Sequence, residues 1–175
     1  ASHNPARYNG CKISGPGARP VSYDTGIADI ERLATAPSAA PGAARRGQID
    51  QRDISGDYAR WLMTHIAGAP PIRPFTLAID TGNGMMGELL PRLFQSGGGP
   101  LPCHVIPLYF EPDGRFPNHE PNPLNPANMR DLQAAVRAHR ADLGIAFDGD
   151  GDRVMFVDER GELVASDRIT ALLAG

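Results

Sequence analysis

Residues 142–158 read DLGIAFDGDGDRVMFVD, and the rest of the chain is organised around this stretch. Apolar residues of strand type stand on both sides of a short polar loop, in which Asp148, Asp150 and Asp152 occupy every second position. Neighbouring carboxylates repel one another, so such a cluster is costly unless a cation neutralises it. Hard divalent cations bind oxygen ligands, and glycines between the ligands let alternate side chains converge on one point. The stretch therefore predicts a strand, a magnesium-binding loop and a second strand.

Two other interpretations of this loop are weaker. Asp and Gly are common turn residues, so the loop also suits a solvated hairpin turn, but the strict alternation followed by Arg153 argues against it. An EF-hand loop has Glu at its twelfth position, where Glu159 stands, and needs Gly at its sixth position, which Arg153 occupies here. Strands rather than helices are expected on both sides, which excludes the EF-hand.

Composition bounds the class of protein. The chain has 175 residues, 41% of them hydrophobic and 21% charged, as in an ordinary globular protein of one full domain and part of another. A net charge of −3 predicts neither nucleic-acid nor membrane-surface binding, and no apolar run approaches the ~18 residues of a membrane span. Cys11 and Cys103 make no disulfide scaffold or zinc motif, so we expect a reducing cytoplasm.

The order of predicted elements indicates the fold class. Apolar spacing and turn residues predict a helix over 25–34 and a linker over 35–53. After the linker they predict a helix capped by Ser55, a strand over 75–80, a helix that Pro91 delays or kinks, and a strand over 103–110. A helix capped by Asn125, strands on both sides of the aspartate loop and a helix from Ser166 complete the order. Alternating strands and helices predict an α/β fold with a mainly parallel sheet. Ligand-binding loops in such sheets follow the carboxyl ends of strands, where the aspartate loop stands.

A second glycine-rich motif follows the strand predicted over 75–80. Gly82, Gly84 and Gly87, with Glu111 after the next strand, come close to a dinucleotide-binding fingerprint. Glycines in a tight strand-to-helix turn are also needed for packing. We favour packing and predict no dinucleotide cofactor.

The first residues carry a different set of reactive groups. The segment 1–17, ASHNPARYNGCKISGPG, places Ser2 beside His3, with Lys12 ten positions beyond the serine. A lone loop serine indicates little. A hydroxyl accompanied by an imidazole and an ammonium group offers a phosphate or acyl acceptor together with proton-transfer groups.

Together these motifs resemble a known family. ASHNPARYNGCKIS resembles the active-site serine loop of the α-D-phosphohexomutases, DGDGDR resembles their magnesium loop, and IDTGNGMMG and EPDGRFPNHEPNP resemble the bacterial phosphomannomutase/phosphoglucomutase branch. The resemblance implies four three-layer αβα domains around one cleft, each built on a mainly parallel mixed sheet. Residues 1–52 would be the C-terminal part of domain I, residues 53–163 domain II, and residues 164–175 the truncated start of domain III.

The resemblance also implies a mechanism. Phosphorylated Ser2 would donate its phosphoryl group to a sugar monophosphate, and the bisphosphorylated sugar would turn over and return its other phosphate. The implied ligands of Mg²⁺ are Asp148, Asp150, Asp152 and the phosphate on Ser2.

Three basic residues complete the implied site. Arg153 would offset charge at the phosphoryl group, and it would contact the substrate together with Ser2 and Lys12. His3 and Lys12 stand where the family places groups that assist proton transfer, and we favour Lys12. A lysine near a divalent cation and Arg153 has its charged form disfavoured, which suits a proton shuttle.

The expected substrates are hexose 1-phosphates and 6-phosphates of mannose or glucose, handled by a monomer or a dimer. Phosphoglucosamine mutase is one alternative, and a divalent-cation-binding α/β domain without transfer chemistry is another. We expect the chain to be a fragment cut at both ends, and inactive alone because it lacks the family's sugar-selecting and phosphate-binding loops. The segment 35–53 departs from the family by being longer and richer in Ala and Pro.

Overall fold

The structure is a computed structural model that describes residues 7–8, 10–36, 47–65, 73–96 and 102–174. The chain divides into two compact units, one of residues 9–52 and one of residues 1–8 with 53–175. Ser2 and His3 of the predicted serine loop lie outside the described residues. Within the described part of the chain, no helix combines the length and apolarity that crossing a membrane requires.

The smaller unit is built from short helical segments. It contains two 3₁₀ turns, η1 (Pro16–Ala18) and η2 (Tyr23–Thr25), and the helix α1 (Ile27–Thr35). The helix was predicted over 25–34, and it begins later because Ser22 and Thr25 close a capping box on the 3₁₀ turn. Gly26, with φ of 157°, separates that turn from α1.

The larger unit contains a five-stranded sheet with the strand order β2-β1-β3-β4-β5. The central β1 pairs in parallel with β2 and β3, while β4 pairs antiparallel with β3 and β5. The bounds are β1 (Phe75–Asp80), β2 (Cys103–Leu108), β3 (Leu143–Phe147), β4 (Val154–Val157) and β5 (Leu163–Val164). All strands except β4 run in one direction, so the predicted α/β fold with a mainly parallel mixed sheet is confirmed.

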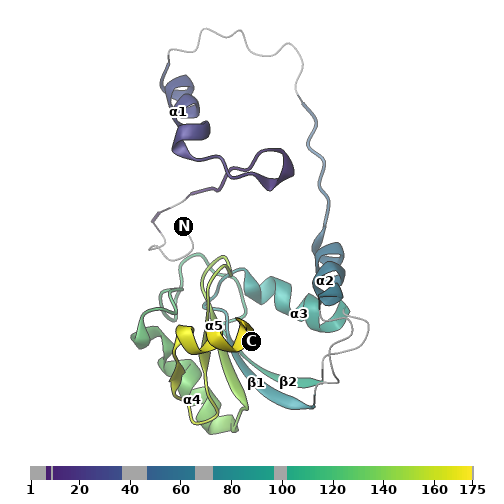
Figure 1. Ribbon diagram of the computed structural model, residues 1–175, viewed down its shortest axis with the longest axis vertical. Helices are drawn as coiled ribbons and strands as arrows, with labels where there is room; N and C mark the ends of the chain where they lie inside the picture. The colour runs from purple at the N-terminus through teal and green to yellow at the C-terminus, as the bar shows by residue number, and fades with distance from the viewer. Residues whose placement is uncertain (1–6, 9, 37–46, 66–72, 97–101, 175) are drawn as a thin grey trace. The chain divides into compact units, whose positions relative to one another are not determined.

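Helices cover both faces of this sheet (Figure 1). On one face, α4 (Arg130–His139) buries Leu132 and Val136 against Ala78, Ala146 and Val157 of three neighbouring strands. On the other face, α3 (Met86–Ser96) packs through Leu90 against Leu77 and Ile79. Ala78 and its two neighbours thus point to opposite sides, as the period of two in a strand requires. The unit is a three-layer αβα sandwich, and α2 (Ser55–Thr64) packs on α3.

Two predictions about helix starts were wrong in detail. Ser55 is the first residue of α2 rather than its cap, and the Asp53 carboxylate accepts a hydrogen bond from the Ser55 N–H at 2.9 Å instead. Helix α3 begins at Met86, five residues before Pro91, so Pro91 does not delay it. Pro91 is the sixth residue of α3, beyond the first turn, so its missing N–H removes the bond that would run to the Gly87 carbonyl.

Two other boundaries follow from single residues. Strand β2 ends at Leu108, two residues earlier than predicted, because Tyr109 has a φ of 57° and leaves the extended conformation. Asn125 accepts a hydrogen bond from the Ala127 N–H as predicted, but the turn that it caps is the 3₁₀ helix η3 (Pro126–Met129), which leads into α4. The last helix, α5 (Ser166–Ala174), begins where predicted.

Candidate metal centre

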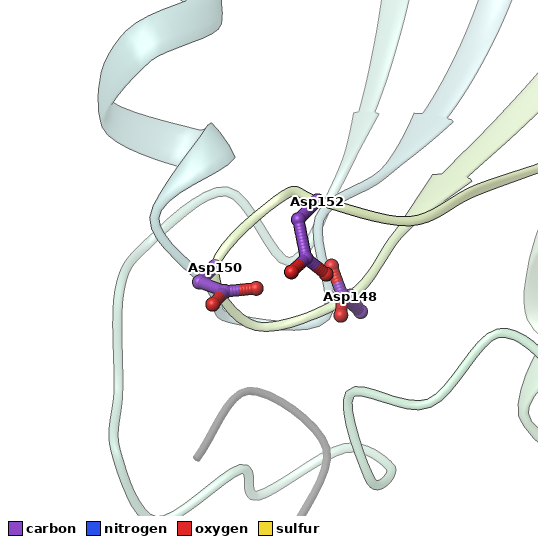
Figure 2. Close-up of side chains that lie close together, drawn as sticks. All are labelled: Asp148, Asp150 and Asp152. Atoms are coloured by element: carbon purple, nitrogen blue, oxygen red, sulfur yellow. The ribbon is translucent and has the colours of Figure 1, made fainter. Parts of the chain in front are cut away.

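The three aspartates of the loop between β3 and β4 converge (Figure 2). One carboxylate oxygen from each of Asp148, Asp150 and Asp152 lies within 4.8 Å of the others. Asp148 is fully buried, whereas Asp150 and Asp152 are exposed. The alternating spacing in the sequence therefore brings three anionic oxygens to one point at the carboxyl end of β3.

Hydrogen bonds within the loop hold Asp148 in place. Its N–H donates to the Arg153 carbonyl at 3.2 Å, and its own carbonyl accepts the Gly151 N–H at 3.1 Å. Its side chain accepts the backbone N–H of Arg153 at 3.1 Å. Gly151 has a φ of 76°, in the left-handed region that glycine enters at no steric cost, so the turn can close without strain.

Arg153 lies against the aspartates of its own loop. Its Nε donates to Asp148 Oδ2 at 3.0 Å and lies 3.6 Å from Asp152 Oδ1. The Arg153 side chain is 30% exposed, and its charge offsets part of the loop's negative charge. This cation stands at the edge of the carboxylate cluster.

The glycine-rich turn after β1 supports the aspartate loop. The Met85 N–H donates to the Gly149 carbonyl at 3.0 Å, and a Cβ on Gly84 would lie only 2.7 Å from that same oxygen. A Cβ on Gly87 would lie 1.8 Å from the Phe110 carbonyl oxygen. Both glycines are thus explained by close backbone packing, the interpretation that we favoured over dinucleotide binding.

The chemistry of the donor set fits a hard divalent cation. Octahedral Mg²⁺ holds oxygen ligands at roughly 2.1 Å, so its neighbouring ligands lie about 3 Å apart and its opposite ligands about 4 Å apart. The three carboxylate oxygens lie within 4.8 Å of one another, close to the distance between opposite ligands of Mg²⁺. Small rotations of the exposed Asp150 and Asp152 side chains would bring their oxygens to ligand distance. Asp148, Asp150 and Asp152 are the residues that would hold the ion.

A buried polar network lies beside this centre, and the sequence interpretation did not find it. His119 is 14% exposed, and its Nε2 lies 3.0 Å from Oδ2 of Asp80, which is 2% exposed. The hydrogen bond from His119 to Asp80 raises the pKa of the imidazole above its ordinary value, more than burial lowers it. An aspartate that ends a strand and a histidine in a Pro-rich loop were the available signals, but nothing in the sequence pairs residues 39 positions apart.

Tyr109 extends this network to helix α4. Its O–H donates to Asp131 Oδ2 at 2.7 Å, and its ring meets the His119 ring edge to face at 5.4 Å between centroids. Burial and the bond to Asp131 raise the pKa of Tyr109 to about 12, so the phenol stays neutral. The ring therefore supports His119 without adding charge.

Three further residues belong to the predicted site. Lys12 is exposed and belongs to the unit of residues 9–52, whereas the aspartate loop belongs to the other unit. Ser2 and His3 lie outside the described residues. The structure thus brings together the acidic residues and Arg153 from the predicted set.

Comparison with known proteins identifies the family. The family description "Phosphoglucomutase/phosphomannomutase, alpha/beta/alpha domain II" matches residues 60–161, more than half of the chain. The chain belongs to the phosphoglucomutase/phosphomannomutase family. The matched range contains both the glycine-rich turn and the aspartate loop, so the family's domain II is the unit that carries the candidate metal centre.

Individual members of the family match well beyond this range. A phosphomannomutase of Escherichia coli (strain K12) is 41% identical over 178 residues, covering 99% of this chain and 38% of that protein. A phosphomannomutase/phosphoglucomutase of Pseudomonas aeruginosa is 41% identical over 173 residues, covering 99% of this chain and 35% of that protein. The chain thus spans about two fifths of the length of the curated relatives that it matches.

Solved structures agree with the fold. A phosphoglucomutase/phosphomannomutase family protein from Burkholderia thailandensis has a TM-score of 0.63 at 38% identity, over 71% of this chain and 26% of that chain. A putative phosphomannomutase from Thermus thermophilus has a TM-score of 0.78 at 27% identity, over 99% of this chain and 38% of that chain. The three-layer architecture is therefore that of the family.

Proposed function

We propose that this chain is the catalytic phosphoserine and metal-binding part of a phosphohexomutase that interconverts hexose 1-phosphate and hexose 6-phosphate. The convergence of Asp148, Asp150 and Asp152 at the carboxyl end of β3 carries the proposal. Membership of the family supports the reaction class, and the names of the relatives support mannose and glucose phosphates as substrates. Mg²⁺ is the proposed cofactor.

Ser2 is the proposed phosphoryl carrier. Its phosphorylated hydroxyl would transfer a phosphoryl group to the free hydroxyl of a sugar monophosphate, and the resulting bisphosphate would return its other phosphoryl group to Ser2 after turning over. A divalent cation held by the aspartate loop supplies electrostatic stabilisation to the phosphoryl oxygens when it is bound. The chain's own task is to position these groups, because phosphoryl transfer depends mainly on alignment and charge.

The basic residues have separate proposed roles. Lys12 would remove the proton from the attacking sugar hydroxyl and return it to the leaving oxygen, with His3 assisting near Ser2. Arg153, whose side chain is 30% exposed, would offset part of the loop's negative charge and contact the transferred phosphoryl group. Ser2, Lys12 and Arg153 are thus the proposed substrate contacts.

The proposed domain division assigns 1–52 to domain I, 53–163 to domain II and 164–175 to domain III. The sugar-selecting and phosphate-binding loops of the family belong to later domains. We therefore propose that the chain alone does not turn over hexose phosphates, and that the complete enzyme acts in the cytoplasm.

Two measurements on Ser2 test the proposal. Mass spectrometry of the purified protein is expected to find a phosphate on Ser2, which a mere cation-binding domain need not carry. In the full-length protein, Ser2→Ala is expected to abolish conversion of mannose 1-phosphate to mannose 6-phosphate, while Ser14→Ala, an exposed control, leaves it unchanged. Substantial turnover by the Ser2→Ala variant would reject Ser2 as the carrier.

A further inference from the structure

The two ring nitrogens of His119 both face hydrogen-bond acceptors. Nε2 lies 3.0 Å from the Asp80 carboxylate, and Nδ1 lies 2.8 Å from the Glu120 carbonyl oxygen. A carbonyl oxygen cannot donate, and an ionised carboxylate only accepts, so this arrangement suits a ring that carries a proton on each nitrogen. Asp80 also accepts the Gly82 N–H at 2.8 Å through its other oxygen. The geometry is that of an imidazolium paired with a buried aspartate.

This pair joins two segments that are far apart in the sequence. Asp80 ends β1 and leads into the turn 81–85, whereas His119 belongs to the loop 109–122. The same segments are joined again where the Asn83 N–H donates to the Tyr109 carbonyl at 2.9 Å and its side chain donates to the Glu111 carbonyl at 2.8 Å. Asn83 has a φ of 58°, a conformation that needs such contacts to persist.

The turn 81–85 in turn supports the aspartate loop. Its last residue, Met85, donates its N–H to the Gly149 carbonyl, between the first two of the three aspartates. Gly84 lies so close to Gly149 that a Cβ would be 2.7 Å from its oxygen, so the two backbones are in direct contact. A displacement of the turn must therefore move the loop as well.

We propose that His119 is a positioning residue, which as an imidazolium clamps the turn 81–85 to the loop 109–122 and thereby holds the aspartate loop in its converged form. This inference rests on the proposed function in one respect, which is that the aspartate loop is taken to be a cation site. It adds a residue from outside the loop whose proton controls the loop's geometry.

The groups around His119 are consistent with a charged ring. The carboxylates of Asp80 in β1 and Asp131 in α4 favour the cation through their charges, and the Glu120 backbone carbonyl favours it by accepting a hydrogen bond from the ring. Tyr109 packs on the ring as a neutral phenol. The raised pKa of His119 agrees with this arrangement.

The protonation state can be read directly by NMR. Ring ¹⁵N and ¹H spectra of the wild-type chain at pH 7 are expected to show protons on both nitrogens of His119. A singly protonated His119 ring at pH 7 would reject the imidazolium, and with it the proposal.

The positioning role is read from hydrogen exchange at the Met85 amide, which reports its bond to Gly149 without any cation. His119→Gln is expected to lower the Met85 protection factor by roughly tenfold or more at pH 7, the loss of one hydrogen bond to a charged group. His104→Gln, on the exposed side of β2, is the matched control and should change nothing. Unchanged Met85 protection in the His119→Gln variant would overturn the proposal.

The wild-type protein provides a measurement that does not depend on the variant folding. Met85 protection, corrected for the intrinsic exchange rate, should fall with rising pH at the same midpoint as deprotonation of the His119 ring. If Met85 protection shows no change at the pH where the His119 ring deprotonates, the proposed role of His119 is contradicted. Titration of the same samples with Mg²⁺ tests the cation site separately, because the clamp is expected to follow His119 whether or not Mg²⁺ binds.

Discussion

Burial divides the three aspartates of the candidate metal centre into different kinds of ligand. Asp148 is fully removed from solvent and accepts hydrogen bonds from the backbone and side chain of Arg153, which offset the cost of burying a charge. Asp150 and Asp152 stay exposed and can move toward an ion. In the proposed cation site, Asp148 would therefore fix the position of the ion, and the other two aspartates would complete its coordination.

Replacing the exposed Asp150 by Asn tests whether its negative charge contributes to cation binding. Asp150→Asn keeps the shape of the side chain and removes one of three anionic donors, so the affinity for Mn²⁺ is expected to fall by roughly tenfold or more. Isothermal titration with Mn²⁺ measures it, and Glu159→Gln removes an equal charge from an exposed position outside the loop. Equal affinities in the two variants would mean that net charge, and no specific ligand, attracts the ion.

A methyl group at Gly84 tests whether the turn supports the loop. Gly84→Ala places a Cβ 2.7 Å from the Gly149 carbonyl oxygen, and backbone on both sides leaves little room to adjust. We expect a loss of about 1–3 kcal/mol in the free energy of unfolding, together with weaker Mn²⁺ binding. Urea unfolding measures the first quantity.

The matched control is Gly114→Ala, where an added Cβ meets nothing within 4 Å. A Gly84→Ala protein as stable as the Gly114→Ala protein would show that the two backbones are not in firm contact.

At the scale of elements, hydrophobic spacing and turn residues predicted the helices and the first four strands, and their alternation predicted an α/β fold with a mainly parallel sheet. The two-residue β5 was not predicted, and the three-layer αβα arrangement was implied by the resemblance to the family. The ends were harder, because single residues decide them. Tyr109 ends β2 by adopting a positive φ, and Ser55 is the first residue of α2 rather than its cap, with its N–H donating to the Asp53 carboxylate. The Asp80–His119 pair was missed for a similar reason, since a contact between distant loops leaves no periodic trace.

This pair makes the stability of the larger unit depend on pH. Because pairing raises the pKa of His119 above its ordinary value near 6.5, its stabilisation is complete below that pH and is lost as pH rises through the folded-state pKa. We expect the free energy of unfolding of the wild type to decline between pH 6 and 8, and His119→Gln to remove that part of the decline. This pH range lies below the ordinary pKa of a thiol, and burial raises the pKa of Cys103 further, so Cys103 does not contribute to the decline.

Urea unfolding at several pH values provides the measurement, with His104→Gln as the control. Parallel curves for the wild type and His119→Gln would show that the pair does not contribute in this range.

At the scale of the whole molecule, the sequence motifs indicated the family by resemblance, and the structure showed how the elements of one αβα unit are arranged. The aspartate loop, the glycine-rich turn and the loop 109–122 all lie in the unit that contains residues 53–175. Ser2 and Lys12 were singled out because a hydroxyl, an imidazole and an ammonium group stand close together in the sequence, and the resemblance to the family's serine loop implied their roles. Their proposed approach to the aspartate loop, 146 positions along the chain from Ser2, would be a property of the folded enzyme that no local pattern encodes.

Titration of the chain with Mg²⁺, followed on backbone amide signals, tests the central claim that the aspartate loop binds a divalent cation. We predict saturable shifts that concentrate on residues 148–153 and on Met85, whose amide bonds to Gly149. The Asp150→Asn variant should need roughly tenfold more Mg²⁺ to reach the same shifts. Absent or non-saturating shifts in this loop, or shifts centred elsewhere in the chain, would contradict the assignment.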